Sequence, residues 1–416
     1  MVTVLDTAEE NKLRKKIDAL GSRGIALIAG LAAEHESAHG IYDMAVLSPG
    51  IDPAVPLVQN FLKRRIAMIG ELEMAFELCR CPVIGITGTN GKTTTTQLVE
   101  RMLNACGVKT LAAGNIGPAF SARVQETARL DVITLELSSF QLERIDRFRC
   151  GTAVWLGFAP DHLDRYASIE EYYAAKIRIF ENQTASDWAI VNFRDKLPEL
   201  KAQKITFSAY VSGGDFDLRS GVIHFRGEPV LRMSDARLRG THNAENLMAA
   251  LGVGFVRGLS FSAMQPPLCA YEPLPHRCEP IRIVNGVEWV NDSKGTNPDS
   301  VEKALHSEVR PVVLIAGGKD KGFEYEMLND LVAEKCRAAV TIGEMADRIE
   351  SLWKDRLPVE NAGLSLEKAV ETAARLAQPG DVVLFSPGTS SFDMFRNYAD
   401  RGNQFRTLVQ ALTAKP

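Results

Sequence analysis

The stretch Val83-Ile-Gly-Ile-Thr-Gly-Thr-Asn-Gly-Lys-Thr93 decides the fold class of this chain. Val83–Thr87 predicts a buried strand, and Gly88–Thr93 predicts a phosphate-binding loop that opens a helix. Glycines let several backbone N–H groups face one phosphate, and the positive end of the helix adds to the attraction. The usual spacing of kinases and GTPases needs a glycine where this chain has Ile86. We therefore expect a nucleoside triphosphate site outside that pattern, with a purely structural turn as the alternative.

Two positions near this loop are suited to hold Mg²⁺ on a triphosphate. The hydroxyl of Thr93 is expected to contact the metal, while Lys92 reaches the β- and γ-phosphates. Glu136 ends the apolar run Asp131–Leu135, where a buried carboxylate needs a partner or a metal ion. The alternative for Glu136 is a solvated position at a strand end.

Further short polar loops follow apolar runs along the chain. They are Gly114–Gly117, Glu136–Gln141, Asp161–Asp164, Asn291–Thr296 and Ser386–Ser391. Ligands of open parallel sheets collect beyond the carboxyl ends of the strands. Together with the first loop, they predict one assembled active site.

His162 and Lys176 are candidates for groups that act on the phosphates. A neutral imidazole at His162 can bind a metal or orient a phosphate, although a lone histidine is more often a surface or packing residue. Tyr172, Lys176 and Phe180 share one helix face at i,i+4 spacing. A lysine on such a face usually extends to water. If Lys176 points at the phosphates instead, it supplies charge or, once carbamylated, a carboxylate ligand.

The last third of the chain carries groups suited to a carboxylate-bearing substrate. Asp292 and Lys294 lie in one polar turn, and Lys321 follows the glycines at 317 and 318. Lysines and hydroxyls beyond neighbouring strands suit a carboxylate. Arg277, next to a proline-containing segment, is placed to touch a phosphate when two domains close.

Composition limits the class of protein. A length of 416 residues suggests about three domains, and 45% apolar with 24% charged residues is ordinary for globular chains. The net charge of −4 gives no reason to expect a nucleic-acid partner, and no apolar run is long enough to span a membrane. The seven scattered cysteines do not suggest a disulfide framework or a zinc site. We interpret them as reduced packing residues of a cytosolic protein.

Alternating strands, polar turns and helices predict an α/β fold with parallel sheets. We expect a truncated Rossmann-like domain at 1–81, a P-loop-type ATPase domain at 82–272 and a Rossmann-like domain at 273–416. The segment Tyr271–Pro275 is the expected linker, and residues 204–238 are expected to form a small antiparallel appendage. The expected strands are Val2–Asp6, Met44–Leu47, Val83–Thr87, Val108–Ala112, Val132–Leu137, Ala153–Phe158, Trp188–Asn192, Val287–Asn291, Val312–Ala316, Ala338–Ile342 and Val382–Phe385.

The front of the chain is unusual for a nucleotide-binding domain. Such domains open with a strand and a Gly-rich turn, and an acidic residue ends the second strand. Val2–Asp6 matches that second strand, so we expect about 30 residues, one strand–turn–helix unit, to be missing. The alternative is a small N-terminal domain.

Several motifs resemble the ATP-dependent Mur ligases of peptidoglycan synthesis, over nearly the whole chain. They are Thr87–Thr93, Gly114–Gly117, Glu136–Glu143, Asp161–Tyr166, His242–Asn246, Pro275–Arg277, Asn291–Asn297 and Arg401–Asn403. Within the family, the runs at 136–143 and 291–297 most resemble the ligase that adds D-glutamate to UDP-N-acetylmuramoyl-L-alanine. The resemblance implies an ADP-forming amide ligation through an acyl phosphate, in the cytoplasm, by a monomer. The alternatives are a sister Mur or folylpolyglutamate synthase-like ligase, or an inactive nucleotide-binding remnant.

The resemblance also implies roles for individual residues. Lys92, His162 and Lys176 would be catalytic. ATP would contact Gly88, Thr89, Asn90, Gly91, Lys92, Thr93, Thr94, Asn243, Asn246, Arg277 and Asp292. Thr93 and Glu136 would hold one Mg²⁺, and His162 with a carbamylated Lys176 would hold the second.

The two other substrates would have separate sites. The UDP-substrate would contact Asp6, Ser48, Gly50, Asn115, Ser138 and Gln141. D-Glutamate would contact Lys294, Thr296, Lys321, Ser391, Phe392 and Tyr398. Tyr398 stands where the family usually has phenylalanine, which is a mild departure.

Overall fold

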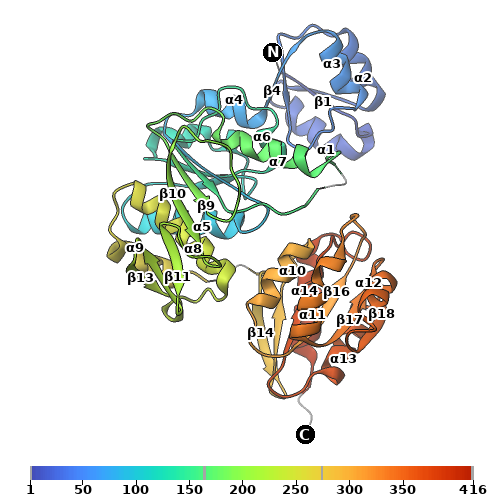
Figure 1. The fold of residues 1–416 in the computed structure, drawn as a ribbon. Helices are drawn as coiled ribbons and strands as arrows, with labels where there is room; N and C mark the ends of the chain where they lie inside the picture. The colour runs from blue at the N-terminus through green and yellow to red at the C-terminus, as the bar shows by residue number, and fades with distance from the viewer. Residues whose placement is uncertain (1, 163–164, 273–274, 414–416) are drawn as a thin grey trace.

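The computed structural model describes residues 2–162, 165–272 and 275–413, which form three α/β domains joined in series (Figure 1). The end of the predicted loop Asp161–Asp164 and the middle of the predicted linker Tyr271–Pro275 lie outside these residues. None of the helices in the described part of the chain combines the length and apolar character that crossing a bilayer requires.

The N-terminal domain contains two separate parallel strand pairs. Its strands are β1 (Thr3–Asp6), which pairs with β2 (Ala26–Ala29), and β3 (Met44–Leu47), which pairs with β4 (Ala67–Gly70). Its helices are α1 (Glu10–Gly21), α2 (Gly30–His39), α3 (Pro56–Lys63) and α4 (Glu71–Leu78). In α4, Leu72 and Ala75 are buried in the same apolar cluster as the strands of the central domain. This helix therefore packs onto the next domain as well as ending the first.

The central domain is built on a nine-stranded sheet with the order β13-β12-β11-β10-β9-β8-β5-β7-β6. Its strands are β5 (Val83–Thr87), β6 (Ala112–Gly114), β7 (Ile133–Glu136), β8 (Thr152–Trp155), β9 (Trp188–Asn192), β10 (Gln203–Ser208), β11 (Phe216–Arg219), β12 (Val222–Phe225) and β13 (Glu228–Arg232). Pairing is parallel from β6 to β11 and antiparallel only for β11–β12 and β12–β13. The predicted antiparallel appendage is thus partly wrong, because its first two strands continue the parallel sheet.

The strand predicted at Val108–Ala112 is also wrong, since β6 begins only at Ala112. The backbone N–H of Lys109 donates to Asp131 Oδ2, and the N–H of Thr110 donates to Asn104 Oδ1. Side chains therefore take the backbone donors that a strand ladder would need.

Helices of the central domain cover the sheet and deliver the loops. They are α5 (Lys92–Ala105), α6 (Ser139–Leu142), α7 (Ile169–Ile177), α8 (Thr241–Val256) and α9 (Phe261–Cys269). Leu98, Met102 and Leu247 pack with sheet residues such as Ile190 in a continuous buried cluster. This packing fixes α5, and with it the loop that precedes α5.

The C-terminal domain has a six-stranded sheet with the order β14-β15-β19-β16-β17-β18. Its strands are β14 (Glu279–Val284), β15 (Val287–Asn291), β16 (Val312–Gly317), β17 (Cys336–Ile342), β18 (Val359–Gly363) and β19 (Val382–Phe385). Its helices are α10 (Pro298–His306), α11 (Asn329–Lys335), α12 (Ala346–Trp353), α13 (Leu366–Leu376) and α14 (Tyr398–Ala411). Only β14 and β15 pair in an antiparallel manner, through the turn at Asn285 and Gly286. The carboxyl ends of β15, β16 and β19 carry the polar loops.

Candidate active site

The phosphate loop is shaped by two glycines in backbone conformations that other residues rarely adopt. Gly88 has φ +148°, and Gly91 has φ +85° directly before α5. A Cβ atom at Gly91 would clash with Oδ1 of Asn246, whose side chain extends from α8. The Nζ atom of Lys92 donates to the carbonyl oxygens of Gly88 (3.0 Å) and Thr89 (2.9 Å). The lysine predicted to meet the phosphates therefore lies folded over the loop.

A second lysine reaches the same loop from α7. The Nζ atom of Lys176 donates to the carbonyl oxygen of Gly88 at 3.0 Å and lies 4.8 Å from the centre of the Tyr172 ring. The residue is 1% exposed, so it does not extend to water. Burial and the nearby charge of Lys92 lower the pKa of Lys176 well below its ordinary value. Lys176 is thus a buried amine whose uncharged form is favoured by burial.

Glu136 ends β7 beside this loop. Its Cα partner across the sheet is Ile86, two residues before Gly88, and its side chain is 2% exposed. Oε1 accepts a hydrogen bond of 2.7 Å from Nδ2 of Asn115, whereas Oε2 is buried without a partner among the described residues. A buried carboxylate oxygen without a donor is suited to a cation. Thr93, buried in the first turn of α5, is the nearby hydroxyl predicted to share that cation.

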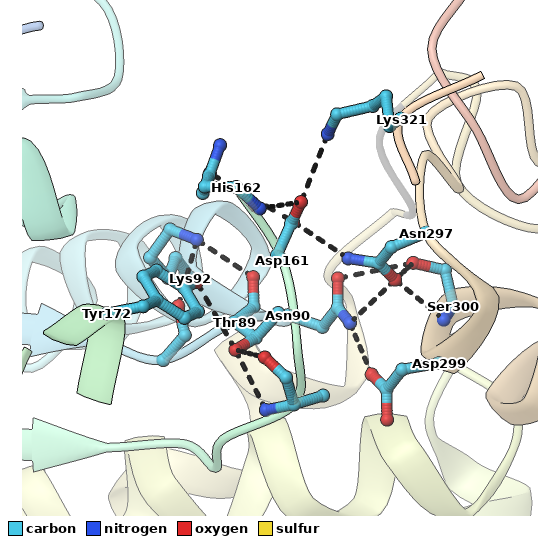
Figure 2. A network of polar contacts seen from close by, with 12 residues as sticks. Thr89, Asn90, Lys92, Asp161, His162, Tyr172, Asn297, Asp299, Ser300 and Lys321 are labelled. Carbon is cyan, nitrogen blue, oxygen red and sulfur yellow. Dashed lines mark hydrogen bonds and ion pairs between the residues drawn. The ribbon is translucent and has the colours of Figure 1, made fainter. Parts of the chain in front are cut away.

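The loop after β8 is held by the C-terminal domain (Figure 2). Oδ1 of Asp161 lies 3.1 Å from Nζ of Lys321, and Oδ2 accepts a hydrogen bond of 3.0 Å from Nδ2 of Asn297. Burial raises the pKa of Asp161, but the charges of His162 and Lys321 outweigh it and lower the pKa overall. Asp161 is therefore a buried carboxylate shared by two domains.

His162 follows Asp161 with a left-handed backbone, φ +56°. Its N–H donates to Oδ1 of Asp161 at 2.8 Å, and its ring packs edge-on against Phe140 and Tyr172. Burial lowers the pKa of His162, so the neutral imidazole needed for metal binding is favoured.

Further contacts join the phosphate loop to the first turn of α10 (Figure 2). Nδ2 of Asn90 donates to Asp299, and the hydroxyl of Ser300 donates to Oδ1 of Asn90 at 3.3 Å. Asn297 caps α10 by accepting from the backbone N–H of Ser300 at 2.9 Å. Side-chain hydrogen bonds thus join the start of this helix to the phosphate loop.

A pocket between the central and C-terminal domains brings together most of the residues predicted to bind ATP. Its lining includes Asn90, Gly91, Thr94, Asn243, Asn246, Arg277, Asp292 and Lys294. Burial raises the pKa of Asp292 to about 6, although the Ser386 hydroxyl donates to its Oδ2 at 2.7 Å. Burial and the charge of Arg277 lower the pKa of Lys294 to about 8. Nε of Arg277 is buried without a hydrogen-bond partner among the described residues, as expected of a group that awaits a ligand.

The residues predicted for the UDP-substrate are divided between two places. Ser48, Gly50 and Gln141 line one pocket between the N-terminal and central domains. Ser138 and Gln141 also form a reciprocal cap at the start of α6. Asp6 is not part of this pocket, and its Oδ1 accepts from the backbone N–H of Ala8 at 2.9 Å.

The residues predicted for D-glutamate surround the loops of the C-terminal domain. Ser391 is buried, Thr296 is half-buried, and Phe392 is 68% exposed. The ring of Tyr398 lies 5.0 Å from Nζ of Lys294. Among the residues predicted for D-glutamate, Lys321 contacts the Asp161 loop, with its Nζ atom 3.1 Å from Oδ1 of Asp161.

Arg401 organises these loops, although the sequence interpretation gave it no role. Its guanidinium is fully buried and donates to the hydroxyl and carbonyl of Ser293 and to the carbonyls of Thr389 and Ser390, at 2.8–3.2 Å. The pKa of Arg401 falls to about 10 because of this burial. The run Arg401–Asn403, near the start of α14, was the sequence motif from which a role for this arginine could have been inferred. Asn297, Asp299 and Ser300 were likewise not predicted as site residues, and Asp161 was predicted only as part of the loop Asp161–Asp164.

Two family models match the chain. The Mur ligase middle domain matches residues 86–254, and the Mur ligase glutamate ligase domain matches residues 276–388. The chain belongs to the Mur ligase family, and the match confirms the resemblance inferred from the sequence.

Relatives at moderate identity point to one member of the family. The chain is 42% identical over 421 residues to a Geotalea uraniireducens protein named UDP-N-acetylmuramoylalanine--D-glutamate ligase, covering 99% of this chain and 92% of that protein. A Koribacter versatilis protein of the same name is 42% identical over 425 residues, with the same coverage of 99% and 92%.

Solved structures show the same fold. A pseudomurein peptide ligase type C from Methanothermus fervidus aligns with a TM-score of 0.64 and 17% identity, over 99% of this chain and 94% of that one. The UDP-N-acetylmuramate-alanine ligase MurC from Thermotoga maritima gives a TM-score of 0.64 with 16% identity, over 99% of each chain. These likenesses confirm the predicted three-domain α/β architecture.

Proposed function

We propose that this chain is an ATP-dependent ligase that adds D-glutamate to UDP-N-acetylmuramoyl-L-alanine. The relatives that share its sequence over 99% of its length carry that name. The observation that carries the proposal is the contact between Asp161 and Lys321. Asp161 belongs to the central domain, which carries the phosphate loop, and Lys321 belongs to the domain proposed to bind the amino acid. A ligase of this kind must bring a phosphorylated carboxylate and an incoming amine together.

The reaction requires positioning and charge stabilisation more than covalent help from the protein. The terminal carboxylate of the UDP-substrate attacks the γ-phosphorus, which gives an acyl phosphate and ADP. The amine of D-glutamate then attacks the acyl carbon, and phosphate leaves from the tetrahedral intermediate. Lys92 stabilises the transferring phosphoryl group through its positive charge. Its ammonium, which donates to the Gly88 carbonyl here, would turn to the phosphate oxygens when ATP is bound.

A first Mg²⁺ would be held by Thr93 and Glu136. The unpartnered Oε2 of Glu136 fits an oxygen ligand of a divalent cation, and Asn115 fixes the orientation of the carboxylate. When bound, the cation neutralises charge on the phosphate oxygens.

A second Mg²⁺ would be held by His162 and a carbamylated Lys176. An uncharged amine is the form that adds CO₂, and burial favours that form at Lys176. The carbamate would place a carboxylate where the Nζ atom now donates to Gly88. His162 would contribute its neutral imidazole.

The remaining predicted residues divide between the three substrates. Asn243, Asn246, Arg277 and Asp292 would contact the nucleotide, since they share one pocket with the phosphate loop. Ser48, Gly50 and Gln141 would contact the UDP-substrate from the pocket between the first two domains. Lys294, Thr296, Lys321, Ser391 and Tyr398 would bind D-glutamate. We also propose domain boundaries at 81/82 and 272/273, and a monomeric enzyme in the cytoplasm.

The proposal is tested by phosphate release with ATP, UDP-N-acetylmuramoyl-L-alanine and D-glutamate, omitting each in turn. We expect release only when all three are present, with an amide product of matching mass. A screen of other amino acids separates this function from that of a sister ligase. Release that is equally fast with a different amino acid would assign the chain to another step. No release with any amino acid would support the inactive nucleotide-binding alternative.

A further inference from the structure

Two cysteines lie one residue apart at the junction that leads into the phosphate-loop strand. Cys79 directly follows α4, and Cys81 lies two residues before β5. Both are partly exposed. Sγ of Cys79 donates to the carbonyl oxygen of Cys81 at 3.2 Å, so the first thiol lies folded against the second cysteine. The residue between them is anchored, because the backbone N–H of Arg80 donates to Oγ1 of Thr127 at 3.0 Å.

We propose that Cys79 and Cys81 form a redox-active dithiol, in which Cys79 attacks a low-molecular-weight disulfide and Cys81 resolves the product into an intramolecular disulfide. The Cys79 thiolate attacks one sulfur of the oxidant, the S–S bond breaks, and one thiolate leaves. Cys81 then loses its proton and attacks the Cys79 sulfur, releasing the second thiolate. Two electrons pass from the protein dithiol to the oxidant, and one Cys79–Cys81 bond forms.

The environment of the pair differs from that of the other cysteines. Hydrogen bonding to the Cys81 thiol, helped by the backbone N–H of Cys81 and the hydroxyl of Thr127, lowers the pKa of Cys79 to about 6 despite partial burial. Of the two thiols, Cys79 is therefore the one that more readily forms the thiolate that reacts in thiol–disulfide exchange. In every other cysteine the pKa is raised, and Cys81 owes this to the same hydrogen bond. The others are Cys106, Cys150, Cys269, Cys278 and Cys336.

The position of the pair gives oxidation a structural consequence. A disulfide between residues 79 and 81 would close a small ring around Arg80, whose backbone N–H donates to Thr127. Val83 and the rest of β5 follow at once and end in the phosphate loop. The dithiol therefore lies where a redox change acts on the strand that carries the nucleotide site.

Trypsin offers a direct test, because it cleaves after Arg80 and separates the two cysteines. Peptide 66–80 then contains only Cys79, and peptide 81–92 contains only Cys81. The full chain is treated with glutathione disulfide at neutral pH, its free thiols are alkylated, and the digest is analysed by mass spectrometry without reduction. We expect the two peptides to be recovered joined, and to separate on reduction.

Matched variants assign the two roles. In Cys81→Ser, peptide 66–80 should carry a stable glutathione on Cys79, and in Cys79→Ser, peptide 81–92 should remain alkylated. Cys106→Ser removes a partly exposed cysteine elsewhere, and the joined peptides should form as in the unaltered chain. Two results would overturn the proposal: stable glutathione on Cys79 of the unaltered chain without joined peptides, or equal modification of Cys79, Cys106 and Cys269.

Discussion

The Nζ atom of Lys321 lies 3.1 Å from Oδ1 of Asp161, so a cation of the C-terminal domain is neutralised by a carboxylate of the central domain. Both side chains are largely buried, at 15% and 10% exposure. A substrate carboxylate that binds Lys321 must therefore share this cation with Asp161 or displace it. The same contact ties the loop that carries His162 to the domain proposed to bind the amino acid.

Replacing Lys321 with alanine should weaken D-glutamate binding selectively. Loss of a charge-assisted hydrogen bond costs about 1.5–3 kcal/mol, which corresponds to a rise of roughly tenfold to a hundredfold in the KM for D-glutamate. The KM for ATP should change much less. Initial rates against each substrate provide the measurement. Lys319→Ala is the control, since this neighbouring side chain is exposed. Equal KM changes for both substrates would contradict the assignment.

Replacing Glu136 with glutamine should raise the Mg²⁺ concentration needed for half-maximal activity, by about tenfold or more. The amide keeps an oxygen that can accept from Asn115 but removes the charge that a cation requires. A Mg²⁺ titration of the initial rate checks this. Glu126→Gln, on an exposed pair with Arg123, should leave the titration unchanged. An unaltered Mg²⁺ requirement in Glu136→Gln would exclude this carboxylate as a ligand.

Replacing Lys176 with alanine should abolish most of the activity and leave the fold intact. Added short carboxylates should restore part of it, because they supply the oxygen ligand that the carbamate would provide. Activity is measured with and without acetate or formate at constant ionic strength. Lys196→Ala, at an exposed position, serves as the control. Full activity of Lys176→Ala without additives would refute the second metal site.

His242 should make stability depend on pH below neutrality. Its Nδ1 lies 2.9 Å from the Ser307 hydroxyl, and burial, together with the charges of Lys303 and Arg277, lowers its pKa to about 4, although Asp299 opposes this. Because the folded-state pKa lies below the unfolded value of about 6.5, the stabilisation is complete above about pH 6.5 and is lost as the pH falls towards 4. The loss is at most about 3 kcal/mol, and less in practice because the ring keeps partial contact with solvent.

His242→Gln removes the titration and can keep the bond to Ser307. As the pH falls from about 7.5 to about 5, the thermal midpoint of the unaltered chain should therefore fall more than that of the variant. His306→Gln, at an exposed position on α10, is the control for removing a histidine outside the pocket. If the thermal midpoints of all three proteins changed with pH in parallel, the pKa of His242 would not differ between the folded and unfolded states.

Arg401→Lys should destabilise the C-terminal domain by about 3 kcal/mol, because one ammonium cannot replace five hydrogen bonds from three nitrogen atoms. Chemical unfolding followed by tryptophan fluorescence measures the change. Arg396→Lys, whose side chain is 89% exposed, should be neutral. Equal stability of the two variants would mean that the guanidinium fork is dispensable.

The parts of the fold that could be predicted are those with strong local signals. β5, β9, β15 and β19 have the predicted bounds, because each is an apolar run bounded by polar or turn residues. β4 and β18 were missed, since Ala67–Gly70 and Val359–Gly363 contain small or polar residues and gain their order from neighbouring strands. The hairpin of β14 and β15 was overlooked although Asn285-Gly286, with φ of +52° and +76°, is a strong turn signal.

In the candidate site, too, residues with a strong local signal could be predicted and residues that depend on distant contacts could not. Lys92 and Glu136 could be placed from the sequence, because each follows a strand within a recognisable loop. The partners of Asp161 could not, since Asn297 and Lys321 lie 136 and 160 residues away and meet it only when two domains are in contact. Burial of Lys176 was also unpredictable from spacing alone, because the same i,i+4 face can lie against solvent or against another loop.

The nucleotide pocket has walls from two domains, with Asn90 and Asn246 on one side and Arg277 and Asp292 on the other. A ligand that touches both walls binds best to the arrangement in which they face each other, so its concentration sets how often the chain adopts that arrangement. Nucleotide affinity is then also a measure of interdomain geometry. By the same linkage, a substitution at Asp299, which holds Asn90 but does not line the pocket, still changes that affinity.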